Sequence, residues 1–308
     1  MKNLRELLYF RKKERKAFIL VSVLMLGTLL ISCATAFSWF VRLQVLSIYN
    51  ERGIISSRSM AQVITEVISK VLYEVAGRSS SDNFTQEWFQ PFVIPLVDEE
   101  LGIWVIQVIP LDDKIPLRNL FLPDGNTLRR ELNDIWDNLW EKLEHRELNN
   151  LMLDFLDRNK RPRVGGAERD NFINRGPYDM SELLILSEDV TPEILSEINK
   201  YCTIWSEGRI NLNVAPLDVL ELLPGLDNGL AERLIRHREE NPIEKLSDVQ
   251  TVPGASSKTS IQLTNIAGFK SRYFEIKIQC IDTDGSSGRT YSIIFDRTGK
   301  QIVNWEEI

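Results

Sequence analysis

The residues with the clearest capacity for chemistry are acids and an amide gathered in the middle of the chain. The segment LDFLDRN is followed closely by GGAERDNF, and together they supply oxygen-bearing side chains at Asp154, Asp157, Asn159, Glu168 and Asp170. Calcium binds to carboxylate and amide oxygens in flexible loops of this kind. The spacing does not match an EF-hand, and the same residues are compatible with Asp157 ending a helix beside solvated loop acids. Calcium binding and a purely structural role both stay open.

A second candidate is INLNVAPLDVLELLPGLDNGLAERLIRHREENP, residues 210–242, which predicts two helices joined by a tight turn. Helix-hairpin-helix units often contact a DNA phosphate through backbone amides of a Gly-apolar-Gly loop and the next helix N-terminus. Here Gly225 opens the loop, but Asp227 replaces the second glycine and Gly229 follows in the helix. A second loop of this kind begins at Gly254. We expect both hairpins to serve as scaffold.

Composition and motifs limit the classes of function. The chain carries 37 Lys and Arg against 44 Asp and Glu, a formal net charge of −7. Residues 1–16 hold seven basic and two acidic residues, a net charge of +5, which leaves −12 for the rest of the chain. An acidic body repels polyanions, so nucleic acid is not an expected partner. The sequence has no G-x-S-x-G, Walker or H-E-x-x-H motif, so we do not expect an enzyme.

Three cysteines are too few for a disulfide framework. Cys202 lies among apolar residues, and Cys280 falls on the apolar side of FEIKIQC. We expect both to be core thiols, with a bridge between them as the alternative. Trp205, next to Ile204, is likewise expected in the core rather than in a ligand platform.

The candidate residues described above follow an N-terminal segment that has the properties of a membrane helix. Residues 17–41 contain no charge, and at about 1.5 Å per residue such a helix is long enough to cross a bilayer. The basic residues before it predict a single pass with a cytoplasmic N-terminus. The stretch from 42 to 76 continues at helical spacing, which favours a retained helix. Its apolar stripe consists of Met60, Ile64, Val67, Ile68, Val71, Leu72 and Val75.

Several fates of this N-terminal segment are compatible with the residues. LISC, ending at Cys33, loosely fits a lipoprotein box, and the ATA at residues 34–36 fits a signal peptidase site. KKERKAFILVSV resembles a type IV prepilin leader, which would be cut between Ala17 and Phe18. Most pilins have Gly before the cut and Glu at the fifth mature position, where this chain has Ser22. In the remaining interpretation, the N-terminal segment is an uncleaved membrane anchor.

The rest of the chain predicts strands at both ends and helices between them. PFVIPLVDEELGIWVIQVIPLDD indicates a central strand region, apolar on both faces. Residues 127–158 have a helical apolar stripe, SELLIL and TPEILSEINKY predict two short helices, and Thr191 with Pro192 suits the start of the second. From 262 onward the period is two, and Gly-containing turns join three strands in a meander. The expected fold class is α+β.

Together these segments resemble one family, the type II secretion system protein K minor pseudopilins. The likeness runs in order from about residue 11 to the C-terminus. The segments that carry it are KERKAFILVSVL, IPLDDKIPLRNL, LMLDFLD, GGAERDNFINRGPYDMSELLIL, TPEILSEINKYCTIWSEGRINLNVAPLDVLELL and SRYFEIKIQC. No single motif is strong, but their order is. Members of this family typically lack the Glu that Ser22 replaces.

The resemblance implies an N-terminal spine helix, a pilin-like antiparallel sheet and a large inserted all-α domain. The expected divisions are a leader at 1–17, a transmembrane helix at 18–41, the first part of the pilin-like domain at 42–125, the insertion at 126–260 and the second part at 261–308.

The resemblance also implies a place at the tip of a periplasmic pseudopilus that exports folded proteins across the outer membrane. Implied partners are the minor pseudopilins I and J, pseudopilin H, the major pseudopilin, prepilin peptidase and the bacterial inner membrane, with the body of the chain in the periplasm. It further implies N-methylation of Phe18 and calcium in the inserted domain. The alternative function is a membrane-anchored DNA receptor of the competence type, which carries similar hairpins.

Overall fold

The computed structural model describes residues 2–74, 76–95, 103–186, 188–281 and 287–308. Within these ranges it describes side chains from residue 21 onward, except those of residues 49, 50, 52, 76, 95 and 287. The chain forms two compact units, Met1–Met60 and Ala61–Ile308.

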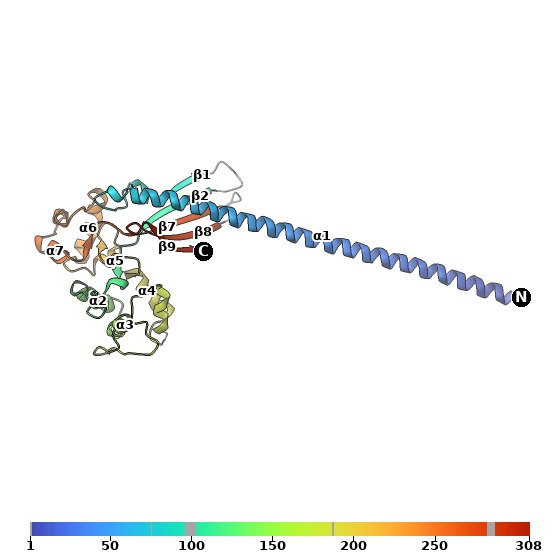
Figure 1. Cartoon of the computed structure of the whole chain (residues 1–308), viewed down its shortest axis with the longest axis horizontal. Coiled ribbons are helices and arrows are strands. Elements are labelled where there is room, and N and C mark those ends of the chain that lie inside the picture. The colour runs from blue at the N-terminus through green and yellow to red at the C-terminus, as the bar shows by residue number, and fades with distance from the viewer. Residues whose placement is uncertain (1, 75, 96–102, 187, 282–286) are drawn as a thin grey trace. The chain divides into compact units, whose positions relative to one another are not determined.

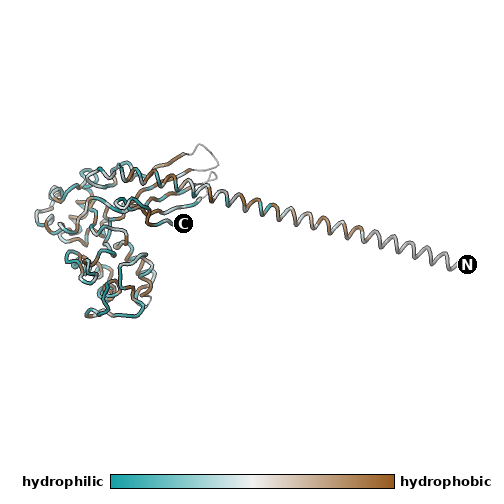
Figure 2. Tube along the Cα trace, viewed as in Figure 1, coloured by the Kyte–Doolittle hydropathy of each residue, from teal (hydrophilic) through white to brown (hydrophobic). Residues whose placement is uncertain are grey.

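The first unit is helical throughout its described residues and belongs to α1, which runs from Lys2 to Glu74 (Figure 1). Large apolar side chains between Val21 and Ile48 are exposed along this helix, and Figure 2 shows them as brown segments of the trace. Burying one such side chain is worth about 1.5–3 kcal/mol, so a long exposed row requires a lipid or protein environment. Among the described residues, one helical stretch, Val21–Glu74, contains a window long and apolar enough to cross a membrane. The helix therefore fits a single-pass anchor.

The last turns of α1 belong to the second unit and supply its first core residues. Ala61, Ile64, Ile68 and Leu72 are buried, which confirms a large part of the predicted stripe. Val67 was assigned to the same stripe, but its side chain is 56% exposed, so that assignment is wrong. Because a helix turns by 3.6 residues, Val67 lies beyond the edge of the buried face that positions 64, 68 and 72 define. Val75, the last predicted member, lies outside the described residues.

A five-stranded antiparallel sheet forms the core partner of these turns. Its order is β1-β2-β7-β8-β9. The strands are β1 (Phe92–Pro95), β2 (Ile103–Pro110), β7 (Tyr273–Ile281), β8 (Ser287–Asp296) and β9 (Gln301–Glu307). On one face Trp104 pairs with Cys280 and Ile106 with Ile278, and all four side chains are buried. The predicted meander is confirmed as β7, β8 and β9.

β2 has a neighbour on each side, as the prediction of a central strand requires. Only one of its faces is fully buried, however, since Ile103 on the other face is half exposed. The apolar residues on that second face reflect partial cover by the rest of the unit rather than a second full core layer. Leu101, assigned to the same face, lies outside the described residues.

The chain between β2 and β7 is mainly helical. Its helices are η4 (Leu117–Asn119), α2 (Arg130–Lys142), α3 (Leu148–Leu156), η5 (Met180–Leu186), α4 (Pro192–Tyr201), α5 (Leu217–Leu220), α6 (Asn228–Glu240), η6 (Leu246–Thr251) and α7 (Ser257–Gln262). Two short parallel pairs tie this region together, β3 (Ile115–Pro116) with β4 (Cys202–Thr203) and β5 (Ile210–Asn211) with β6 (Ala267–Gly268). Before the sheet lie η1 (Ala76–Arg78) and η2 (Glu87–Phe89).

The mixture of an N-terminal apolar helix, an antiparallel sheet and an all-helical region confirms the predicted α+β class. Local signals place several helix ends. The Thr191 hydroxyl accepts a hydrogen bond from the Ile194 amide at 3.4 Å, and Pro192 occupies the first position of α4, as predicted. The helical stretch predicted at 127–158 is divided into α2 and α3 by a break that contains Glu144 at a positive φ of 58°. The domain boundaries at residues 126 and 260 stay predictions.

Buried carboxylates join the helical region to the sheet. Asp112, just after β2, accepts hydrogen bonds from the backbone amides of Glu207 at 2.6 Å, Arg272 at 2.7 Å and Tyr273 at 3.1 Å. Burial raises the pKa of the Asp112 carboxyl, and these amide hydrogen bonds oppose that rise. One side chain thereby fixes the helical loop at residue 207 against the start of β7.

A second buried carboxylate, Asp82, holds the β8–β9 turn. Its two oxygens accept hydrogen bonds from Arg297 at 2.9 and 2.8 Å, and one of them also accepts from the Ser271 amide at 2.7 Å. The backbone carbonyl of Asp82 accepts from the Asn211 side chain at 3.1 Å. Segments far apart in sequence are therefore held at one junction.

Candidate functional site

The predicted processing site falls in the first part of α1. The backbone of Ala17 and Phe18 is helical, but their side chains lie outside what the structure describes. Ser22 lies in the same helix with an exposed side chain. Cleavage between Ala17 and Phe18 and the role of Ser22 stay predictions.

The acidic loop brings two of its five predicted members into contact with an arginine. Asp154, in α3, and Asp157, the residue that ends α3, are both fully buried. Arg163 contacts both carboxylates through Nη1, with 2.7 Å to Asp154, and its Nη2 donates to the Asn126 carbonyl at 3.0 Å. The Asp154 carboxylate also accepts from the Arg163 amide at 3.0 Å. Arg163 therefore supplies the positive charge beside this pair.

Glu168 adds a third carboxylate to this loop. Its Oε1 atom is buried and has no hydrogen-bond partner within the described residues. Burial raises its pKa, and the negative charges of Asp157 and Asp154 raise it further. Carboxylate oxygens are the ligands that calcium prefers, but the positive charge of Lys160 acts on Glu168 as well as that of Arg163.

The remaining two predicted members contribute less. Asn159 donates to the Asp157 carboxylate through its backbone and side-chain nitrogens, at 3.1 and 3.0 Å. Asp170 is exposed, and no described contact joins it to the other four. Across the described part of the chain, no three His, Cys, Asp or Glu side chains are arranged as metal ligands. In this loop Arg163 lies against the buried carboxylates, and calcium binding stays a prediction.

The two hairpins are present and brace each other. Gly225, between α5 and α6, has a φ of +80°, and Gly254, between η6 and α7, has a φ of +90°. A methyl group on Gly225 would lie 2.5 Å from the Gln262 side chain at the end of α7. A methyl group on Gly254 would lie 2.9 Å from Arg233 in α6. Each loop therefore packs closely against the second helix of the other hairpin.

Asp227 occupies the helix end that a DNA phosphate would need. It caps α6, and its Oδ1 accepts a hydrogen bond from the Leu230 amide at 2.7 Å. Gly229 lies in the first turn of α6, where Arg233 is its nearest neighbour at 3.2 Å from a methyl position. The positive end of this helix is thereby satisfied within the chain.

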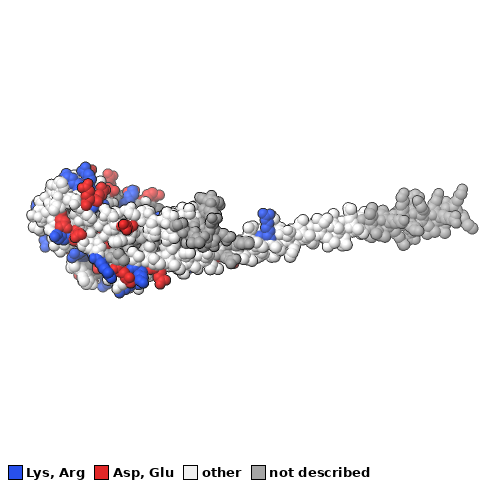
Figure 3. All heavy atoms as spheres, turned by 90° about the horizontal axis from the view of Figure 1, so that it is seen from above, with Lys and Arg blue, Asp and Glu red and all other residues white. Residues whose placement is uncertain are grey.

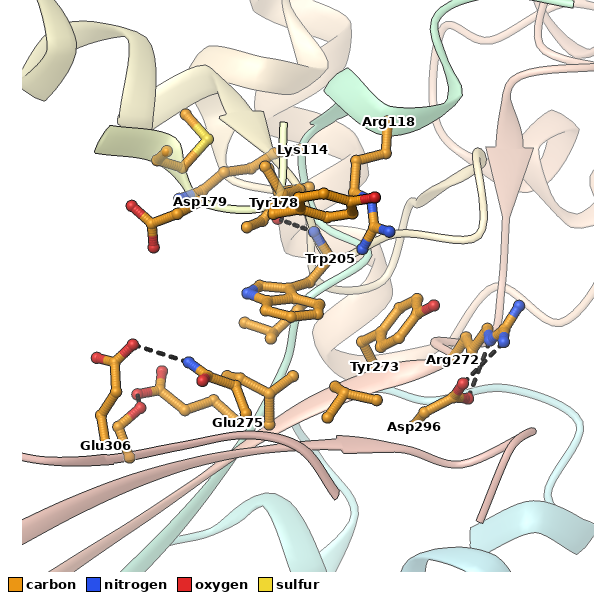
Figure 4. Close-up of a pocket in the computed structure, with 18 of the residues that line it drawn as sticks. Lys114, Arg118, Tyr178, Asp179, Trp205, Arg272, Tyr273, Glu275, Asp296 and Glu306 are labelled. Carbon is orange, nitrogen blue, oxygen red and sulfur yellow. Dashed lines mark hydrogen bonds and ion pairs between the residues drawn. The ribbon is translucent and has the colours of Figure 1, made fainter. Parts of the chain in front are cut away.

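A cleft of about 870 Å³ lies between the outer face of the sheet and the helical region (Figure 4). Its sheet wall comes from β7, β8 and β9, and its other wall from the segments around residues 114–118, 178–180 and 199–205. Trp205 stands in the middle of the cleft, with its ring centroid 5.8 Å from that of Tyr273. The expectation that Trp205 is a core residue is wrong, because its side chain is partly exposed and lines this cleft.

Basic residues of the cleft are held by neighbours. The Arg272 guanidinium donates to Asp296 at 2.9 and 2.7 Å, and this partner lowers the pKa of the Asp296 carboxyl. Lys114 donates to the Asn199 carbonyl at 2.8 Å. Arg118 lies over the Tyr178 ring at 5.6 Å.

The thiol of Cys202, beside the cleft, is not reactive. Burial raises the pKa of Cys202 to about 12. Cys202 and Cys280 are both buried and form no disulfide with each other, as predicted. A thiol that stays protonated at neutral pH is a poor nucleophile. No cysteine chemistry is expected at this cleft.

Comparison with known proteins adds two findings. Residues 206–274 match the family described as the helix-hairpin-helix motif. The whole fold is similar to one chain of the crystal structure of the GspK-GspI-GspJ complex from the type 2 secretion system of enterotoxigenic Escherichia coli, at 13% sequence identity and a TM-score of 0.67. The likeness covers 84% of this chain and 98% of that chain. No curated protein matches this chain in sequence. The chain therefore shares its fold with that chain of the complex.

Proposed function

We propose that this chain is a minor pseudopilin of the K type, which acts at the tip of a type II secretion pseudopilus. The observation that carries the proposal is the order of its parts. An exposed apolar helix continues into turns that pack on an antiparallel sheet, and a helical region lies between β2 and β7. The similar fold in the GspK-GspI-GspJ complex supports this reading.

In this proposal the chain does mechanical work and catalyses no reaction. The apolar helix anchors it in the inner membrane with the N-terminus in the cytoplasm and the body in the periplasm. Prepilin peptidase cuts before Phe18, and the mature helix then joins the I and J minor pseudopilins, with H and the major pseudopilin below. Together they push folded proteins toward the outer-membrane channel.

Two features support the tip position. Ser22 lacks the carboxylate that would pair with the N-terminal amine of a neighbouring subunit, and a tip subunit has no such neighbour above it. The helical region between β2 and β7 also adds bulk beyond a sheet and spine helix. That bulk would obstruct the stacking of a further subunit.

The acidic loop is proposed to bind calcium within this role. Asp154, Asp157 and Glu168 would hold the ion, which would supply positive charge and stiffen the loop after α3. Arg163 supplies positive charge at the same carboxylates. Calcium would therefore have to replace or supplement it.

The N-terminal mass of the protein extracted from bacterial membranes tests the proposal. We expect a chain that begins at N-methylated Phe18, and we expect Ala17→Leu to leave the leader attached. A chain that begins at lipidated Cys33 would remove the membrane helix and contradict the tip mechanism. As a second readout, the full-length chain should co-purify with the I and J pseudopilins from detergent extracts.

DNA binding is the competing outcome. The hairpin match at 206–274 permits it, but Asp227 caps the helix end where a phosphate would approach. A salt-dependent affinity of the full-length chain for duplex DNA, together with no association with I and J, would favour the competence-type receptor.

A further inference from the structure

The cleft around Trp205 has an aromatic centre that the proposed function does not use. In Figure 4 the rings of Trp205 and Tyr178 lie one above the other, and Tyr273 stands beside them. Tyr178 is 61% exposed, and Trp205 and Tyr273 are partly exposed. Arg272 already lies over the Tyr273 ring at 5.1 Å, and arginines lie over Tyr178, so among the described contacts Trp205 is the ring of the three without a cation. An exposed aromatic face attracts a cation by about 0.5–1 kcal/mol.

Carboxylates gather at one end of this cleft. Asp179, Glu275 and Glu306 lie on the same side of Trp205 in Figure 4, while Arg118 and Arg272 lie on the other. Glu275 accepts a hydrogen bond from Ser292 at 2.6 Å, and Glu306 accepts one from Asn304 at 2.8 Å. These bonds orient the two carboxylates, and no basic side chain among the described residues forms an ion pair with either of them.

The basic residues of the cleft do not neutralise this end. Arg272 is paired with Asp296, and Lys114 donates to the Asn199 carbonyl. Arg118 and Arg175 lie over the Tyr178 ring, at 5.6 and 3.9 Å. The acidic end therefore keeps negative charge beside an aromatic surface, which is complementary to a lysine or arginine side chain.

The cleft is also bordered by a free strand edge. β9 is the last strand of the sheet and pairs only with β8 among the described strands. Gln301, Val303 and Glu306 of this strand line the cleft. An extended segment could pair with the outer edge of β9 while its side chains enter the cleft.

We propose that this cleft binds a lysine- or arginine-bearing extended segment of a partner protein. The basic side chain passes over Trp205 and its charge meets Glu275 and Glu306. This binding is independent of the pseudopilin assignment, since peptide affinity and the N-terminal mass are separate measurements.

The test uses the full-length chain in detergent micelles and fluorescence anisotropy. The probe is a short fluorescein-labelled peptide in which lysine alternates with threonine, and the matched control peptide carries acetyl-lysine throughout. We expect the lysine peptide to bind and its affinity to fall as salt rises from low to physiological concentration, because the charges are solvent-exposed. We expect acetylation to abolish the binding.

Point variants locate the site. Glu306→Gln and Glu275→Gln should each weaken binding about two- to fivefold, the range expected for an exposed ion pair. Trp205→Leu should weaken it by a similar factor through the lost cation–π contact. Glu240→Gln, an exposed acid on α6 away from the cleft, removes the same charge and should leave the affinity unchanged.

Three outcomes would overturn the proposal. These are no binding of the lysine peptide at millimolar concentration, equal binding of the acetylated peptide, and equal affinity in the Glu306→Gln and Glu240→Gln variants. Glu306 is exposed at the end of β9, so its substitution leaves the fold intact and a negative result is informative.

Discussion

Replacing Asp82 by alanine tests whether the junction between the sheet and the helical region depends on a buried ion pair. The Asp82 side chain is fully buried, and that of Arg297 is only 11% exposed. The two groups form a bidentate pair at 2.9 and 2.8 Å. The substitution leaves the guanidinium without its counter-charge and the Ser271 amide without its acceptor.

The size of the expected loss of stability follows from this geometry. Removing one member of a buried pair costs about 3–5 kcal/mol, because the remaining charge stays buried. The lost amide bond adds about 1 kcal/mol. For a unit of this size, each kcal/mol lowers the melting temperature by about 2–4 °C. We therefore expect Asp82→Ala to lower the melting temperature by about 8–24 °C.

Thermal unfolding of the full-length chain in detergent micelles, followed by tryptophan fluorescence, measures this change. The matched control is Glu232→Ala, which removes a pair with Arg236 at 3.8 Å whose side chains are 51% and 70% exposed. That pair should contribute no more than about 1 kcal/mol. If Asp82→Ala cost no more than the control, the junction would not depend on this pair and the reasoning would be refuted.

Three further predictions concern other parts of the second unit. Burial raises the pKa of Asp113 to about 6, above its value in the unfolded chain. The unsubstituted protein therefore loses stability as the pH rises toward 6. In thermal melts Asp113→Asn should match the stability of the unsubstituted protein at pH 4 and exceed it by about 1–2 kcal/mol at pH 7. In the same assay Gly225→Ala should lower the free energy of unfolding by about 1–2 kcal/mol, because the φ of Gly225 is +80°. The control Gly53→Ala in α1, where a methyl group has open space, should leave the stability unchanged. Calcium at a hundredfold excess over its Kd should stabilise the chain by about 2.7 kcal/mol, and Asp154→Asn should abolish the effect; no stabilisation of the parent at any calcium concentration would remove calcium from the proposed function.

Local signals in the sequence were sufficient for elements whose determinants lie within a few residues. The cap at Thr191 acts three residues along the chain, and the meander from β7 to β9 depends on alternation and Gly-containing turns. The exposed apolar helix is equally local, since its length and lack of charge define it. These features require no knowledge of which distant residue lies nearby.

The junction could not be predicted in this way. Asp82 and Arg297 are 215 residues apart, and Asp112 bonds amides 95 to 161 residues away. A carboxylate in a loop gives no local sign that the fold will bury it. The same limit explains Trp205, because the cleft that exposes it is built from segments of both the sheet and the helical region.

The hairpins show why a motif and a function have to be argued separately. The sequence predicts the turn at Gly225 correctly, since the turn needs a positive φ that glycine adopts at little cost. What the turn does depends on the contacts around it. Asp227 satisfies the amide end of α6, and the two loops pack on each other's helices. A phosphate would have to displace an anionic cap to reach the Leu230 amide, so the same helix ends that could bind DNA instead stabilise the helical region.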